Sequence, residues 1–109
     1  MTTDLSAERR EDLRVMIRDL HNDQMSVVRI ADYLVCYRHQ AKQLVQLIAT
    51  LYAEEKPSPQ LNQKRLMYFY VAHEAIFRSK DSGFEYVKSF GDQLNDWVDI
   101  FANSGCEEF

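Results

Sequence analysis

A histidine and a glutamate stand side by side in the middle of an otherwise apolar segment, at His73 and Glu74. Burying either side chain without a partner costs on the order of 1–3 kcal/mol, so the pair should line a site or join an inward polar network. The two residues also begin the zinc-protease pattern H-E-x-x-H, but Phe77 stands where the second metal ligand would be. These side chains could therefore supply hydrogen bonds rather than metal chemistry.

Neighbouring residues could extend this pair into a binding surface. Tyr70 and His73 lie three residues apart and therefore share one face of a helix, which either Glu74 or Phe77 completes. Arg78 follows Glu74 by four residues, a spacing at which a solvated ion pair contributes only about 0.3–0.5 kcal/mol. Two interpretations follow: Tyr70 is a core residue and Arg78 a surface partner of Glu74, or all of them line one site.

Metal and disulfide chemistry are not indicated elsewhere in the chain. Cys36 and His39 have the spacing of a metal-ligand pair, but no second pair accompanies them. His21 and Cys106 fit no pattern that would complete such a site. The two cysteines also lack the paired spacing of a disulfide framework. We interpret both as free thiols, with Cys36 buried, and expect neither a metal nor a cofactor.

Helices must position these residues, because apolar side chains recur at helical spacing and the 109 residues include only 3 Gly and 2 Pro. The predicted helices cover about residues 4–21, from Ser26 to a bend near 37–40, from there to 52, 61–80, and 84–102. Ser26 is predicted to be the N-cap of the second helix, accepting hydrogen bonds from its free amides. The prolines of residues 56–59 predict a loop, and residues 81–83 a glycine-capped helix end.

The helix predicted over residues 61–80 is apolar around much of its circumference, which favours a central position in the fold. A short break is predicted in the last helix near Gly91. Five or six helices would then pack around one core, as an irregular bundle or as a short superhelix. The length suits a single domain spanning residues 1–109.

The overall composition limits the classes of function. Hydrophobic residues make up 46% and charged residues 28%, which is typical of a folded soluble domain. The formal net charge of -4 argues against a protein built mainly to coat nucleic acid, so direct nucleic-acid binding is not expected. No apolar run approaches a membrane span, and residues 1–10 are polar where a secretory signal would be apolar. We therefore expect an intracellular protein with no membrane contact.

Two stretches are similar to a known family. The first is Ser26-Val27 followed by YLVCYRHQAKQLV over residues 33–45, similar to a serine and then WLIxHRxxAxxIV. The second is KRLMYFYVAHEAIFRSK over residues 64–80, then Gly83, Glu85-Tyr86 and Phe90, similar to KLxLLYLANDVIQNSxxxGxEFxxxF. Both resemble the CTD-interacting domain (CID, or RPR domain), closest to its branch with the YLANDVIQNS-type helix. The similarity runs from about Leu13 to Phe101.

The resemblance implies an all-α, VHS- and ENTH-like right-handed superhelix, here with five to six helices instead of about eight. It also implies a non-enzymatic nuclear adaptor that binds the phosphorylated C-terminal domain of RNA polymerase II and links transcription to termination or RNA processing. In the implied groove, Tyr70 packs against a proline ring of the peptide, while His73 and Glu74 hold hydroxyls and amides. Arg78 would meet phosphate, and the helix start at Ser26 would meet an anion or a peptide carbonyl.

The chain departs from the family pattern in two places. His73-Glu74 replaces the family's Asn-Asp, which keeps a carboxylate but enlarges both side chains. The family continues into two further helices, with a basic stretch and an IWxxRxVF motif, whereas this chain ends at Phe109. We expect either a shortened member or a fragment. An arginine of those helices commonly meets the phosphate, so selectivity for phosphoserine is open.

Three alternatives stay open from the sequence. The groove could be repurposed to bind another protein's peptide or helix, or the chain could form a homodimer, with exposed Trp97 and Phe101 as the sign. A trafficking module of the VHS or ENTH type is disfavoured, because the first helix mixes acidic and basic residues. RNA binding would need a local basic patch, for which the candidates are Arg38, His39, Lys42, Lys64 and Arg65.

Overall fold

The computed structural model describes residues 5–56, 58–79 and 85–102, and over these residues the chain forms helices and no strands. The elements are α1 (Ala7–Arg18), α2 (Gln24–Cys36), the short 3-10 helix η1 (Arg38–Gln40), α3 (Ala41–Glu54), α4 (Leu61–Ser79) and α5 (Glu85–Ala102). The predicted all-α fold of five to six helices is confirmed. None of the described helices is long and apolar enough to cross a membrane.

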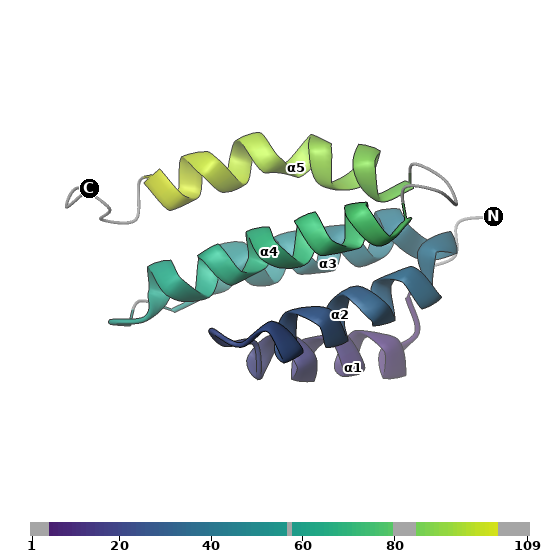
Figure 1. The fold of residues 1–109 in the computed structure, drawn as a ribbon, viewed down its shortest axis with the longest axis horizontal. Helices are drawn as coiled ribbons and strands as arrows, with labels where there is room; N and C mark the ends of the chain where they lie inside the picture. Colours follow the sequence, from purple (N-terminus) through teal and green to yellow (C-terminus); the bar gives the residue numbers. More distant parts are fainter. Residues whose placement is uncertain (1–4, 57, 80–84, 103–109) are drawn as a thin grey trace.

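The helices are arranged in three tiers (Figure 1). Helix α5 lies along one side and packs on both α3 and α4, which form the middle tier. Helices α1 and α2 pack on each other at the opposite side, α1 also contacting α3 and α2 contacting α4. The predicted central position of α4 is thus right in that it lies between α2 and α5. One of its faces nevertheless stays open, with Tyr70 51% and Phe77 56% exposed.

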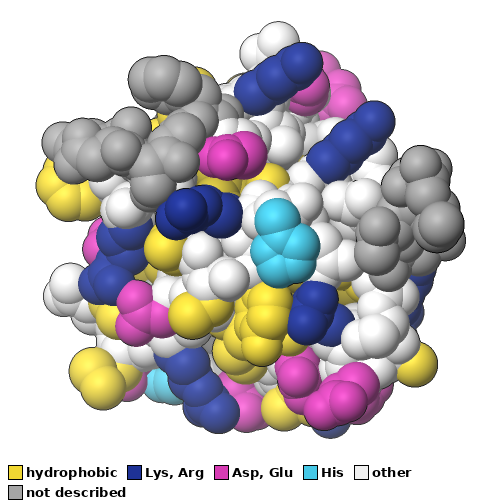
Figure 2. Space-filling view, turned by 90° about the vertical axis from the view of Figure 1, so that its right-hand side faces the viewer, with side chains coloured by type: hydrophobic (Ala, Val, Ile, Leu, Met, Phe, Trp, Pro, Cys, Tyr) yellow, Lys and Arg dark blue, Asp and Glu magenta, His cyan; other side chains and the backbone are white. Residues whose placement is uncertain are grey.

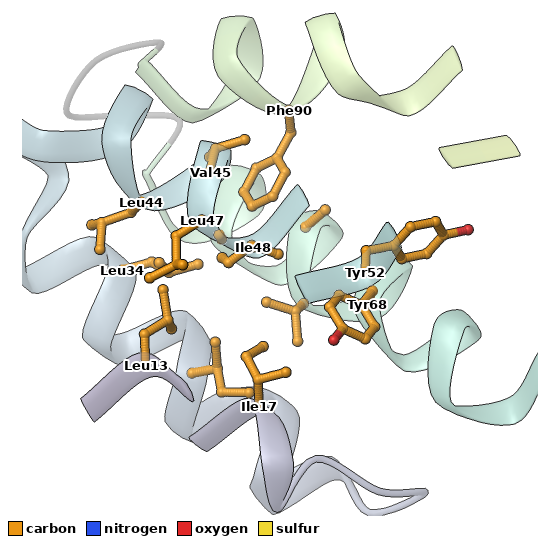
Figure 3. Close-up of a cluster of buried hydrophobic side chains, with 14 of the residues drawn as sticks. Leu13, Ile17, Leu34, Leu44, Val45, Leu47, Ile48, Tyr52, Tyr68 and Phe90 are labelled. Carbon is orange, nitrogen blue, oxygen red and sulfur yellow. The ribbon is translucent and has the colours of Figure 1, made fainter. Parts of the chain in front are cut away.

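The core lies between the tiers, where apolar side chains from α1 to α5 meet (Figure 3). Its aliphatic part includes Leu13, Ile17, Leu34, Leu44, Val45 and Ile48, all at most 3% exposed. Its aromatic part centres on Trp97 of α5, which is 1% exposed and stacks on Tyr52 at 4.7 Å between ring centroids. Trp97 is therefore a core residue, and Phe101 is partly buried. Trp97 is therefore not the exposed aromatic residue that a docking surface or a homodimer interface would need at this position.

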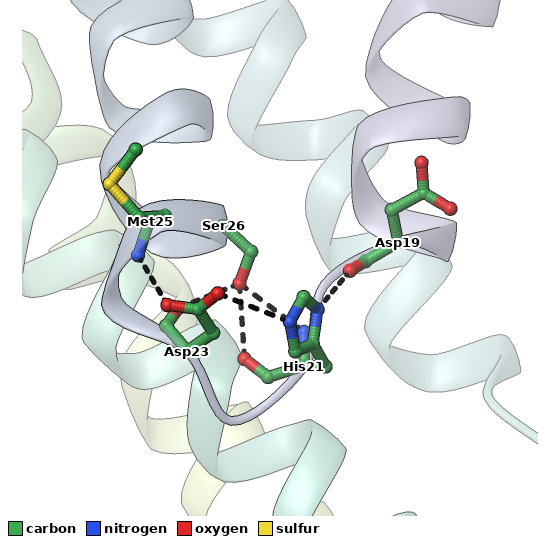
Figure 4. Close-up of polar contacts among 5 residues, drawn as sticks. All are labelled: Asp19, His21, Asp23, Met25 and Ser26. Carbon is green, nitrogen blue, oxygen red and sulfur yellow. Dashed lines mark hydrogen bonds and ion pairs between the residues drawn. The ribbon is translucent and has the colours of Figure 1, made fainter.

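The start of α2 differs from the prediction (Figure 4). Asp23, not Ser26, is the N-cap: its carboxylate accepts a hydrogen bond from the backbone amide of Met25 at 3.0 Å. Ser26 lies inside the first turn, and its hydroxyl is within hydrogen-bond distance of the carbonyl oxygens of His21 (3.0 Å) and Asp23 (2.8 Å). Aspartate and serine are equally good N-caps, so the earlier of the two residues begins the helix.

The other predicted boundaries divide into three groups. The bend near residues 37–40 is confirmed as η1, which Tyr37 enters with φ -113° and ψ 34°. The glycine-capped end over residues 81–83 lies outside the described residues. The predicted break near Gly91 is wrong, because α5 runs through this position without interruption.

Cys36 is a free thiol as expected, but it is exposed rather than buried.

Gly91 gives a test of the packing around α5. A methyl group added at Gly91 would meet no atom within 4 Å. Since glycine inside a helix costs roughly 0.5–1 kcal/mol relative to alanine, Gly91→Ala should raise the free energy of unfolding by about that amount. Urea denaturation followed by circular dichroism measures the change. A loss of stability would mean that α5 is packed more closely at this position than described; Gly91→Pro, which breaks the helix, is the destabilised control.

Candidate functional site

The first turn of α2 and the middle of α4 enclose an open pocket of about 320 Å³. Its lining residues are Asn22, Asp23, Gln24 and Val27 at the α2 end, and Met67, Tyr70, His73 and Glu74 from α4. Three of the five residues predicted from the sequence, Tyr70, His73 and Glu74, thus lie together. The remaining two, Arg78 and Ser26, do not line this pocket.

The register of α4 explains why these side chains face outward. Val71 and Ala75 are fully buried and Ala72 is 2% exposed, and α4 packs on α2. The small side chains of the two alanines allow the helices to approach closely. Because a helix turns by 3.6 residues, the face opposite this buried stripe carries Tyr70 and His73. The contact that fixes α4 in the fold therefore also fixes its open face.

The pocket is acidic. Asp23 and Glu74 are carboxylates on its two sides, and none of its lining residues is Lys or Arg. The Asp23 carboxylate already accepts a hydrogen bond from the backbone amide of Met25, and its Oδ2 lies 3.4 Å from Nε2 of His21. The ring of His73 lies nearly parallel to that of Phe77, with centroids 6.5 Å apart. The pocket thus offers acceptors to hydroxyl, amide or cationic donors, beside the half-exposed ring of Tyr70.

Arg78 lies along the edge of the pocket and is held by two carboxylates. Its Nε donates a hydrogen bond to Glu74 Oε1 at 2.8 Å, as the four-residue spacing predicted, and its guanidinium also pairs with Asp32 of α2. The hydrogen bond to Glu74, with Asp32 adding to the effect, raises the pKa of Arg78 above its ordinary value. Arg78 thus joins α4 to α2 and is already paired before any ligand binds.

Ser26 lies on another side of α2. It lines a neighbouring surface hollow together with Met16, Asp19 and Arg29. This hollow shares Asp23 with the Tyr70 pocket, and the Ser26 hydroxyl is engaged with the carbonyls that precede the helix. The sequence also missed Asp23, which takes the place expected for Ser26 at the helix start and contributes a carboxylate to the pocket. A signal for it was present, since an aspartate directly before a helical pattern is a typical N-cap.

Within the described residues, no group of three His, Cys, Asp or Glu side chains is placed to hold a metal ion. The fold and the pocket together define a class: an all-helical domain with an open, polar and aromatic groove between two of its helices.

The chain belongs to the CID domain family, which it matches over residues 11–108. Domains of this family are protein-interaction modules rather than enzymes, and they bind the C-terminal domain of RNA polymerase II. A comparison with curated proteins found no match.

Proposed function

We propose that this chain is a non-enzymatic, nuclear peptide-binding adaptor that recognises the C-terminal domain of RNA polymerase II and links transcription to termination or RNA processing. Family membership supports the class of ligand. The observation that carries the proposal for this chain is that Tyr70, His73 and Glu74 line one open pocket beside the start of α2.

The pocket residues have the chemistry that such a peptide needs. The exposed ring of Tyr70 is a flat apolar surface on which a proline or tyrosine ring of an extended peptide packs. Glu74 accepts a hydrogen bond from a peptide hydroxyl or amide, and His73 offers a further polar contact at the rim. Arg78 keeps the Glu74 carboxylate in place through their hydrogen bond.

The same electrostatics disfavour a phosphate inside this pocket. Asp23 and Glu74 would repel a dianion, and Arg78 would have to leave both Glu74 and Asp32 to neutralise it. We therefore assign the pocket to an unphosphorylated part of the peptide. This revises the sequence-based expectation that Arg78 meets phosphate.

Removing either main contact should weaken peptide binding without unfolding the domain. Tyr70→Ala removes the aromatic wall and Glu74→Gln removes the charge of the acceptor, and we expect each to cost about 1–3 kcal/mol of binding free energy. The measurement is fluorescence anisotropy of a labelled two-repeat tail peptide titrated with each variant, with circular dichroism to check folding.

Val98→Ala is a suitable control for these variants, because Val98 is 55% exposed on α5 and lines none of the described pockets named above. Its affinity should equal that of the parent chain. If folded Tyr70→Ala and Glu74→Gln both bind as tightly as Val98→Ala, the pocket is not the peptide site.

A further inference from the structure

A second groove lies at the end of the molecule where α5 begins. It measures about 550 Å³ and runs between α5 and the segment formed by η1 and the first half of α3. The charged groups that line it are Arg38, His39, Lys42, Glu85, Lys88 and Asp92. Figure 2 faces this end and shows Lys and Arg side chains on either side of a histidine, with acidic side chains interspersed. This groove shares no lining residue with the Tyr70 pocket.

The cations of this groove come from three elements: Arg38 from η1, Lys42 from α3 and Lys88 from α5. None of the three forms an ion pair with another described residue, whereas Arg78 holds two. Bringing like charges together without partners is unfavourable, and it occurs here in a chain whose net charge is -4. The groove therefore gathers three cations against two carboxylates, Glu85 and Asp92, and none of the three cations is held in an ion pair with another described residue.

The tertiary fold, not the sequence, assembles this cluster. The sequence suggested a patch of Arg38, His39, Lys42, Lys64 and Arg65, but the structure divides it. Arg65 is buried and donates hydrogen bonds to the Tyr52 carbonyl at 3.3 Å, and Lys64 donates to the Arg18 carbonyl at 3.2 Å. Lys88, which lies far along the chain, lines the groove together with Lys42 instead.

The charge pattern favours a single phosphate over a polyanion. Glu85 and Asp92 line the same groove, so a nucleic-acid backbone with a charge on every nucleotide would meet them as well as the cations. One phosphate dianion needs only the cation cluster. Gln46 and Gln93 also line the groove, and their amides can bond both the N–H and the C=O groups of a peptide backbone.

We propose that this groove is a second ligand site, which binds the phosphate of a phosphoserine or phosphothreonine carried on a peptide through Arg38, Lys42 and Lys88. The imidazole of His39 adds a further donor. The inference rests on the proposed function in one respect: the proposed function names the polymerase tail as one source of such a peptide. The phosphate is then recognised in the groove that carries the cations, and not in the acidic Tyr70 pocket.

The test compares phosphorylated and unphosphorylated forms of the same two-repeat tail peptide by fluorescence anisotropy. Phosphorylation of the fifth-position serine should strengthen binding to the parent chain by about tenfold. In Lys42→Glu with Lys88→Glu, and in the milder Lys42→Gln with Lys88→Gln, the ratio of the two affinities should fall to about one. The matched control is Arg14→Glu with Lys56→Glu, which makes the same change of net charge at exposed positions outside the groove.

Nuclear magnetic resonance titrations separate this inference from the proposed function. An unrelated phosphoserine peptide, as well as the tail peptide, should shift backbone amide signals of η1, α3 and α5 only when phosphorylated. If the tail peptides fail to bind but the unrelated phosphopeptide shifts these signals, the second site stands without the proposed function. The inference is overturned if no phosphopeptide shifts them, if the control pair lowers the affinity ratio equally, or if single-stranded RNA binds the groove more tightly than the phosphopeptides.

Discussion

Replacing Trp97 with alanine is expected to remove about 3–5 kcal/mol of folding free energy, enough to leave the domain at the margin of stability. The indole is 1% exposed and stacks on Tyr52, with the two ring planes 9° apart. Three further rings meet it edge-on, from Tyr68 at 6.0 Å, Phe69 at 5.6 Å and Phe90 at 5.9 Å between centroids. Truncation would leave a cavity where three helices meet, and so large a space cannot collapse fully.

Urea denaturation followed by far-ultraviolet circular dichroism measures this loss and does not depend on the indole as a probe. Val98→Ala is the matched control, since Val98 follows Trp97 in the same helix but is 55% exposed. We expect the control to change stability by no more than about 0.5 kcal/mol. Similar losses in the two variants would show that α5 does not bury its Trp97 face against α3 and α4.

The case of Trp97 shows what helical periodicity can and cannot establish. The spacing of apolar residues predicted α5 and placed Trp97 on an apolar face, but it did not tell whether another helix covers that face. An exposed Trp97 was the sign of the alternative in which the groove is repurposed or the chain forms a homodimer. In the structure α3 supplies the cover, since Tyr52 stacks on the indole and its hydroxyl donates a hydrogen bond to the Trp97 carbonyl at 2.6 Å.

The candidate site likewise contains residues that helical spacing can group and residues that only tertiary packing adds. Tyr70, His73 and Glu74 could be grouped from sequence because residues three and four apart on a helix are neighbours whatever the tertiary structure. Asp23 could not be added, because it joins them only through the packing of α2 on α4. The same limit applies to Lys88, which lines one groove with Lys42 only through the packing of α5 on α3. Ser26 and Asp23 were confused because both residue types cap helices well.

Two surfaces of opposite charge follow from this packing. The pocket beside Tyr70 carries two carboxylates, and its neighbouring cation Arg78 is paired with one of them, Glu74, and with Asp32 of α2. The groove beside Lys42 carries three cations and two carboxylates, and the cations form no ion pair with another described residue. A ligand with an apolar, hydroxyl-bearing segment and a separate phosphate fits this division, whereas a phosphate at the first site would face two carboxylates. Phosphorylation could therefore weaken or strengthen binding, depending on which residue of the peptide carries it.

Raising the pH above about 10 should destabilise the domain steeply, because the buried phenols of Tyr68 and Tyr86 have a raised pKa. Burial, reinforced by the hydrogen bond to Glu55, raises the pKa of Tyr68 above its ordinary value. Burial, with a smaller effect of Glu85, likewise raises the pKa of Tyr86, whose hydroxyl donates a hydrogen bond to the Leu34 carbonyl. Both phenols stay protonated in the folded chain at a pH where the unfolded chain ionises them.

The direction of the effect follows from this difference. Below about pH 10 both states hold the phenolic protons and the stabilisation is complete; above it the unfolded state alone releases them, so stability falls by about 1.4 kcal/mol per pH unit for each tyrosine. Urea denaturation between about pH 9 and pH 12 should show a combined slope of about 3 kcal/mol per unit from the pair. Tyr68→Phe with Tyr86→Phe should remove this part of the slope, although it also removes two hydrogen bonds and lowers stability at neutral pH. Val98→Ala, at an exposed position without an ionisable group, should keep the parent slope. A double variant whose slope equals that of the parent chain would show that ionisation of these two phenols does not limit the alkaline stability of the core.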